Sequence, residues 1–203
     1  MQTLYYFHDP MCSWCWGYRP TWLKLLKLLA SAIRIEYVVG GLAPDSDEVM
    51  SKEMANSIQS HWLRIEQELG VRFNHDFWVK CEPRRSTYPA CRAVIAAKHQ
   101  NAEQAMILAI QNAYYLQAKN PSNLNTLVMI AGELKLDVKR FKKDITAVQT
   151  DEALTTQINL ARECQVSGFP SLILHNGASN FPIKVNYKDS AVTYKQIMEY
   201  ITL

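Results

Sequence analysis

The sequence lacks the features of membrane-spanning, nucleic-acid-binding and disulfide-stapled proteins. It has no run of about 18 apolar residues, since the best candidate, residues 22–33, is interrupted by Lys24 and Lys27. The net charge is only +3 and no long basic run occurs, so nothing favours binding to nucleic acid. The five cysteines are odd in number and are not spaced like those of a small secreted scaffold. These absences leave an ordinary globular protein.

Residues 1–9 contain neither the basic region nor the apolar stretch of a secretory signal, and a Cys-x-x-Cys motif already begins at residue 12. We therefore expect a cytoplasmic protein. In a reducing compartment such a motif is more often catalytic or metal-binding than structural.

The first 41 residues read as a strand, a helix and a second strand. Residues 3–7 are rich in Tyr and Phe, and residues 33–39 alternate apolar and polar side chains before Gly40 and Gly41. Between them Trp22, Leu25 and Leu29 recur at helical spacing. This βαβ order predicts parallel pairing of the two strands.

Residues 45–148 read as helical throughout, with no convincing strand. Capping residues and periodicity predict one helix that starts near Asp45 and Glu48 and stops at Gly70. A second helix is predicted over residues 105–115, after a capping box formed by Asn101 and Gln104. A third is predicted over residues 124–134.

Strand signals return near the C-terminal end. We expect a helix over residues 151–164, a strand directly after Gly168-Phe169-Pro170, a hairpin into residues 181–186, and a last helix capped by Thr193 with Gln196. The order predicts an α/β protein in which residues 1–44 and 149–203 form one domain and residues 45–148 an inserted helical domain.

The chemistry is predicted at Cys12 and Cys15, because their motif Cys-Ser-Trp-Cys joins the first strand to the first helix. A helix N-terminus stabilises a thiolate, and the second cysteine lies one helical turn further on. Cys12 is thus expected to be the exposed attacking thiol and Cys15 the more buried resolving thiol. Two alternatives are half of a zinc site, for which no second cysteine pair or His-x-x-x-His motif is present, and a pair of incidental cysteines.

Two prolines bear on this motif. Pro20 falls inside the predicted helix, where it removes a hydrogen bond and introduces a kink, unless a short turn ends there and a separate helix follows. Pro170 directly precedes a predicted strand, and base rates alone favour a trans bond before it.

The combination of strand, Cys-x-x-Cys, proline-containing helix, helical insertion and Gly168-Phe169-Pro170 resembles the DsbA-like branch of the thioredoxin superfamily. The run Phe-His-Asp-Pro-Met-Cys-Ser-Trp-Cys-Trp-Gly at residues 7–17 is similar to bacterial cytoplasmic protein-disulfide isomerases, with FrnE-like proteins as near relatives. The resemblance implies a thioredoxin fold with a large all-helical insertion. It also implies a cis Pro170 beside Cys12, and substrate binding by Ser13, Trp14, Phe169 and Pro170.

Two departures from that family concern the tuning of the cysteine pair. Tyr6 stands where many relatives carry a buried acid, so another group or water must relay the proton of the resolving thiol. Ser13-Trp14 lacks the cationic partner of the strong oxidants, so we expect a potential more reducing than their roughly −120 mV. The segment around Cys91 and Arg92 faces the active site in relatives. The simpler interpretation of Cys81, Cys91 and Cys164 is ordinary buried free thiols.

The sequence thus predicts a disulfide reductase or isomerase that acts by mixed-disulfide exchange on thiol or disulfide proteins and peptides. We expect a monomer or dimer with no cofactor, metal, nucleic acid or membrane, and with glutathione as a candidate co-substrate. One alternative is a glutathione-dependent transferase or isomerase of the kappa-class type, which typically has Ser at the position of Cys12. A binding or adaptor protein with incidental thiols is the other.

Overall fold

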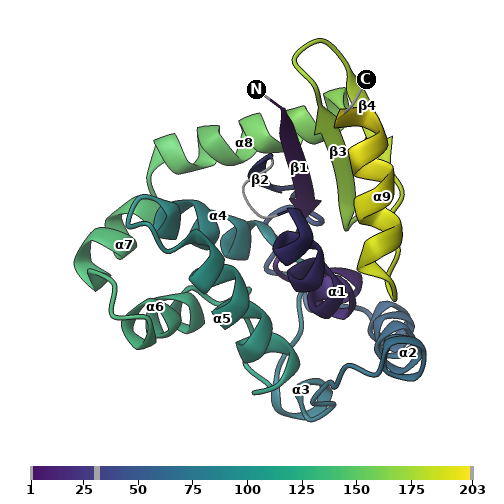
Figure 1. The fold of residues 1–203 in the computed structure, drawn as a ribbon. Helices are drawn as coiled ribbons and strands as arrows, with labels where there is room; N and C mark the ends of the chain where they lie inside the picture. Colours follow the sequence, from purple (N-terminus) through teal and green to yellow (C-terminus); the bar gives the residue numbers. More distant parts are fainter. Residues whose placement is uncertain (1, 30–32, 202–203) are drawn as a thin grey trace.

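A four-stranded mixed sheet forms the centre of the computed structural model, which describes residues 2–29 and 33–201 (Figure 1). Its strand order is β2-β1-β3-β4, with β1 and β2 parallel and the remaining neighbours antiparallel. The bounds are β1 Thr3–His8, β2 Arg34–Val39, β3 Ser171–His175 and β4 Asn180–Ile183. The predicted α/β class, the parallel first pair and the C-terminal hairpin are confirmed.

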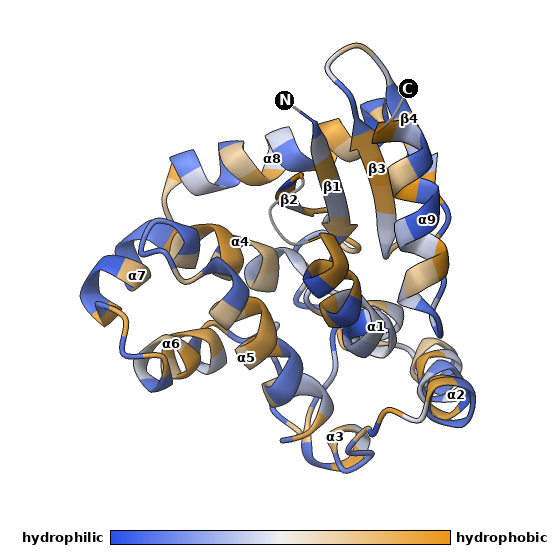
Figure 2. Ribbon diagram, in the orientation of Figure 1, coloured by the Kyte–Doolittle hydropathy of each residue, from blue (hydrophilic) through white to orange (hydrophobic). Residues whose placement is uncertain are grey.

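Helices cover both faces of this sheet. Leu4 and Tyr6 of β1 point into a core shared with α1 (Ser13–Leu29) and α9 (Ser190–Ile201). Phe7 packs on the opposite face with Ala161 of α8 (Val148–Glu163). Figure 2 shows a hydrophobic middle in β3, where Leu172, Ile173 and Leu174 are buried, as expected for a strand covered on both faces.

The chain between β2 and α8 contains helices and, within the described residues, no strand apart from the isolated bridge Val49–Arg84. Alanine-rich α4 is the central helix and packs against α5, α7 and α8. A separate core around Trp62, Phe77 and Tyr115 holds these helices together. They are α2 Lys52–Leu69, α3 Phe77–Lys80, α4 Tyr88–Lys98, α5 Glu103–Tyr115, α6 Leu124–Glu133 and α7 Val138–Ile145.

The predicted starts of two helices in this block are wrong. Helix α2 starts at Lys52, capped by Ser51, whose Oγ accepts a hydrogen bond from the N–H of Met54 at 3.2 Å. Asp45 is not part of it because its carboxylate binds Arg92. Asn101 does not cap α5, because its φ of 58° places it in a left-handed turn between α4 and α5.

The start of the last helix also differs from the prediction. Helix α9 begins at Ser190, and the N–H of Ala191 donates to Asp189 Oδ1 at 2.8 Å. Thr193 and Gln196 lie inside the helix instead of capping it, where they accept hydrogen bonds from the N–H groups of Asn186 and Lys184.

Helix α1 runs without a break through Pro20, so the alternative of a short turn followed by a second helix is wrong. Pro20 is exposed within this helix. One helix therefore connects the cysteine pair to the core under the sheet.

Candidate active site

Cys12 caps the N-terminus of α1. Its backbone carbonyl accepts the first helical hydrogen bond, from the N–H of Trp16 at 3.1 Å. Its Sγ accepts from the N–H of Cys15 at 3.4 Å, which is the bond that an N-cap side chain makes to the third helical residue. The sulfur of Cys12 therefore lies at the positive end of the helix dipole, where negative charge is stabilised.

Both thiols are free and both are buried, so the expectation of an exposed Cys12 needs correction. Cys12 is 6% exposed and Cys15 is 0% exposed. The difference has the predicted direction, but Met11, Leu42 and Phe169 crowd the opening above Cys12. Burial raises the pKa of Cys15 well above its ordinary value.

The loop before β3 reaches Cys12 from the other end of the sequence. The carbonyl oxygen of Phe169 lies 3.3 Å from the Cys12 Sγ and accepts its S–H. The Phe169–Pro170 bond is cis, as the resemblance implies and against the base rate for bonds before proline. Gly40 leaves room for the Phe169 ring, since a Cβ at position 40 would lie 1.9 Å from a ring carbon.

A groove of about 410 Å³ opens over Cys12. Three of the predicted substrate-binding residues, Ser13, Trp14 and Phe169, line it, whereas Pro170 is buried behind Phe169 and is not part of the lining. The other lining side chains are Met11, Leu42, Met50, Met54, Ser57, Ile58, His61, Arg84, Arg85, Thr87 and Tyr114.

The rim of this groove is basic and aromatic. Arg84 and Arg85 line it, and among the described residues no carboxylate does. Arg84 is fixed by hydrogen bonds to the loop before α6, whereas Arg85 is exposed and has no bonded partner within the described residues. Trp14 is held between Tyr187, edge-on at 5.3 Å, and the guanidinium of Arg64 at 5.4 Å. The rim therefore carries positive charge beside Cys12.

A buried carboxylate, Asp9, organises the loop that carries Cys12. One of its oxygens accepts from the N–H of Met11 at 2.8 Å. The other accepts from Leu42 N–H at 2.7 Å, Thr87 Oγ at 2.6 Å and Cys91 Sγ at 3.5 Å. Burial raises the pKa of Asp9, and these hydrogen bonds oppose the rise. The sequence prediction missed this role, although the Asp9-Pro10 pair is a known turn signal.

Tyr6 and His8 form a stack beneath the cysteines. The Tyr6 ring lies 4.4 Å from Trp22 and 5.2 Å from His8. Burial raises the pKa of Tyr6 well above its ordinary value, so the phenol is neutral and does not replace the acid found in relatives. Burial also lowers the pKa of His8 to about 3, so its ring is neutral at physiological pH.

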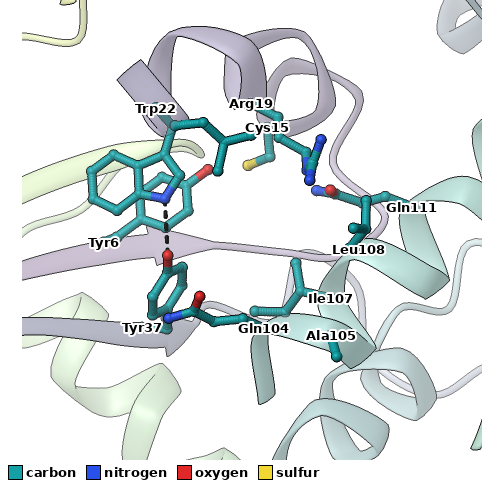
Figure 3. Close-up of a pocket in the computed structure, with 11 residues that line it drawn as sticks. Tyr6, Cys15, Arg19, Trp22, Tyr37, Gln104, Ala105, Ile107, Leu108 and Gln111 are labelled. Carbon is teal, nitrogen blue, oxygen red and sulfur yellow. Dashed lines mark hydrogen bonds between the residues drawn. The ribbon is translucent and has the colours of Figure 1, made fainter. Parts of the chain in front are cut away.

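A second cavity, of about 250 Å³, lies on the other side of Cys15 (Figure 3). It shares no lining residue with the groove over Cys12. Its polar walls are Tyr6, Arg19, Tyr37, Gln104 and Gln111, and the sequence prediction assigned no role to it.

The other cysteines lie in separate places. Cys91 is fully buried, and its Sγ donates a hydrogen bond to Asp9 Oδ2 at 3.5 Å. Cys81 and Cys164 are half-buried and far from the pair in sequence. Arg92 does not reach the active site, because it forms ion pairs with Asp45 at 2.6 Å and Asp151 at 3.2 Å.

The described residues contain no cluster of three or more His, Cys, Asp or Glu side chains that could hold a metal ion. In the same part of the chain, each helix is too short or too polar to cross a membrane.

Curated relatives are adaptor proteins. The chain is 25% identical to the ClpXP adapter protein SpxH of Halalkalibacterium halodurans, over 97% of this chain and 66% of that protein. It is 28% identical to SpxH of Bacillus subtilis, over 85% of this chain and 58% of that protein. The chain thus spans less than two thirds of the length of these relatives.

Solved structures show the same fold over nearly the whole chain. A predicted protein disulfide isomerase from Nitrosomonas europaea has a TM-score of 0.85 at 24% identity, covering 98% of this chain and 96% of that one. The cytosolic disulfide reductase DsbM from Pseudomonas aeruginosa, in a structure with GSH, has a TM-score of 0.79 at 20% identity, covering 99% and 100%. The thioredoxin family matches residues 5–196. The chain therefore belongs to the thioredoxin family, and its fold is the DsbA-like form with a large helical insertion.

Proposed function

We propose that the protein is a thiol–disulfide oxidoreductase that works through Cys12 and Cys15 in the reductase or isomerase direction. The position of the Cys12 sulfur carries this proposal. It lies at the N-terminus of α1, on the floor of a groove, between the Cys15 N–H and the Phe169 carbonyl. The helix N-terminus and the Cys15 N–H stabilise a thiolate at this position, and the groove gives a substrate disulfide access to it.

In the proposed reaction the Cys12 thiolate attacks one sulfur of a substrate disulfide. A bond forms between Cys12 and that sulfur, and the other sulfur leaves with the electron pair and is protonated. The Cys15 thiolate then attacks Cys12, releases the second substrate thiol and leaves a Cys12–Cys15 disulfide. The substrate is reduced by two electrons and the protein is oxidised by two.

The groove supplies substrate contacts for this reaction. The backbone of Phe169 next to Pro170 can pair with an extended substrate segment, as an added strand does. Ser13 and Trp14 flank Cys12 at the start of α1 and complete the wall. The basic rim favours an anionic substrate such as glutathione disulfide or an acidic peptide. The name of DsbM, a cytosolic disulfide reductase, supports the reductive direction and a cytoplasmic location.

Trapping of the mixed disulfide tests the proposal. Cys15→Ala should accumulate a covalent adduct between Cys12 and glutathione or a peptide disulfide, visible by mass spectrometry of acid-quenched samples. Cys12→Ala should form none at this site. Equal absence of adducts in both variants would disprove disulfide exchange. Turnover of an aromatic electrophile with glutathione that survives Cys15→Ala would instead indicate a transferase of the kappa-class type.

A second candidate function, an adaptor for a protein partner, is favoured by the SpxH relatives. In that case the groove would hold the partner and the thiols would be incidental. A Cys12→Ser/Cys15→Ser variant separates the two functions, because a pure adaptor would bind its partner with unchanged affinity and the wild-type protein would catalyse no exchange.

A further inference from the structure

The resolving thiol has no evident route for its proton through the substrate groove. Cys15 does not line the groove over Cys12. Its attack on a mixed disulfide nevertheless requires the thiolate, since the thiolate is the nucleophile in exchange. Burial raises the pKa of Cys15 and makes that thiolate scarce at neutral pH. A path for the proton must therefore exist elsewhere around Cys15.

The cavity between α1 and α5 provides such a path. Figure 3 shows the Cys15 sulfur directed into the ring of lining residues, with Tyr6 on one side of it and Arg19 on the other. The volume of about 250 Å³ accommodates several water molecules, since one water needs roughly 10–15 Å³ on this measure. Polar groups from both helices and from β1 and β2 are available to hold water there.

Two of these polar groups, the side-chain carbonyl of Gln111 and the guanidinium of Arg19, lack a hydrogen-bond or ion-pair partner within the described residues. Gln111 is only 3% exposed, and its side-chain carbonyl accepts no hydrogen bond. Arg19 is half-buried and forms no ion pair or hydrogen bond within the described residues. A buried amide oxygen and a desolvated cation both need partners, and water in the cavity would satisfy them.

Arg19 is the cation that lines this cavity together with Cys15. The two residues are four apart on α1, a spacing that puts their side chains on the same face of a helix. Asp9 contributes negative charge that raises the pKa of Cys15. Tyr6 and Tyr115 are buried and Tyr187 is half-buried, and all three phenols are neutral at pH 7. The remaining titratable neighbour is Cys12, which is bonded to the substrate at the moment of resolution.

We propose that Cys15 releases and regains its proton through the cavity between α1 and α5, and that Arg19 is the positioning residue that stabilises its thiolate. This inference rests on the proposed exchange function. During resolution the proton passes from the Cys15 S–H to water in the cavity, and the thiolate forms the bond to Cys12. The bond between Cys12 and the substrate sulfur breaks, and that sulfur leaves through the groove and takes a proton from solvent.

The test measures the two steps of exchange separately. The reduced protein is mixed with hydroxyethyl disulfide, a neutral substrate, and quenched with acid at intervals between pH 6 and 9. Mass spectrometry then gives the rate of mixed-disulfide formation and the rate of its conversion to Cys12–Cys15. In Arg19→Gln we expect conversion to slow by roughly threefold to tenfold at pH 7 and its pH profile to move to higher pH, since one pKa unit corresponds to tenfold.

Three comparisons make the result specific. Arg19→Lys keeps the charge and should retain most of the conversion rate. Lys24→Gln removes an exposed charge from the same helix and should change neither step. Gln111→Leu should slow conversion while the formation rate stays the same, because it removes a polar wall of the cavity without touching the groove.

An unshifted conversion profile in Arg19→Gln, or an equal shift in Lys24→Gln, would overturn the role of Arg19. Conversion at the wild-type rate in Gln111→Leu would overturn the cavity as the proton path. If the wild-type protein forms no mixed disulfide at all, the proposed function fails instead, so the two failures are distinguishable.

Discussion

The sulfur of Cys12 lies 3.3 Å from the carbonyl oxygen of Phe169, although the two residues are 157 positions apart in the chain. The Phe169 ring keeps this loop in place by lying directly against the backbone of Gly40. The position of one glycine therefore decides how closely the loop before β3 can approach the Cys12 thiol.

Gly40→Ala should displace Phe169, because the new Cβ would lie 1.9 Å from a carbon of its ring. Overpacking of this kind costs about 1–3 kcal/mol. We expect that loss in urea unfolding, together with slower formation of the mixed disulfide at Cys12. Gly168→Ala is the matched control, since a Cβ there meets no atom within 4 Å. Wild-type stability and exchange rate in Gly40→Ala would show that the loop does not need this contact.

Arg85→Gln should discriminate between anionic and neutral substrates. Arg85 is exposed on the rim of a groove that none of the described carboxylates lines. We expect mixed-disulfide formation with glutathione disulfide to slow by roughly twofold to fivefold at low salt, because exposed charges contribute little and are screened. The rate with hydroxyethyl disulfide should not change. Lys139→Gln, a change at an exposed residue of α7, controls for net charge. An equal effect on both substrates would contradict charge recognition.

His8 should make the protein less stable in mild acid. Its pKa is about 3 in the folded protein against 6.5 for the free side chain. Between these values the unfolded chain binds a proton and the folded protein does not, so the free energy of unfolding decreases as the pH falls below 6.5. The slope of this contribution approaches about 1.4 kcal/mol per pH unit.

Urea unfolding of the wild-type protein and of His8→Phe between pH 4.5 and 7.5 measures this contribution. The slope should be smaller in His8→Phe, whereas His61→Gln, a change at an exposed histidine, should retain the wild-type slope. Parallel curves for the wild-type protein and His8→Phe would mean that His8 is protonated in the folded state.

The sheet and the cysteine motif could be predicted because their signals are local. Residues 3–7 and 33–39 carry strand patterns, and the motif between strand and helix places Cys12 at a helix N-terminus. The starts of α2, α5 and α9 were misplaced for one physical reason. Asp45, Asn101 and Thr193 are residue types that cap helices, but each is used differently, in an ion pair, a left-handed turn and a helix interior.

Other parts of the site could not be predicted from local pattern, because they depend on contacts between distant segments. Asp9 accepts a hydrogen bond from Thr87, which is 78 positions away in the chain. Arg19 and Gln111 come from different helices and line the same cavity between α1 and α5. No periodicity in either segment indicates such a meeting. The burial of Cys12 was missed for the same reason, since Leu42 and Phe169 cover it from elsewhere in the chain.

The hydrogen bonds from α4 and its N-cap to the Asp9 carboxylate tie the helical insertion to the loop that carries Cys12. Thr87 and Cys91 supply donors to the same oxygen that accepts from Leu42, while Met11 donates to the other. Because the insertion supplies these donors, its helices cannot be exchanged without affecting the loop that carries Cys12. Any replacement of these helices, in evolution or by design, must bring its own donors to Asp9 or leave a buried carboxyl group without them in the loop that precedes Cys12.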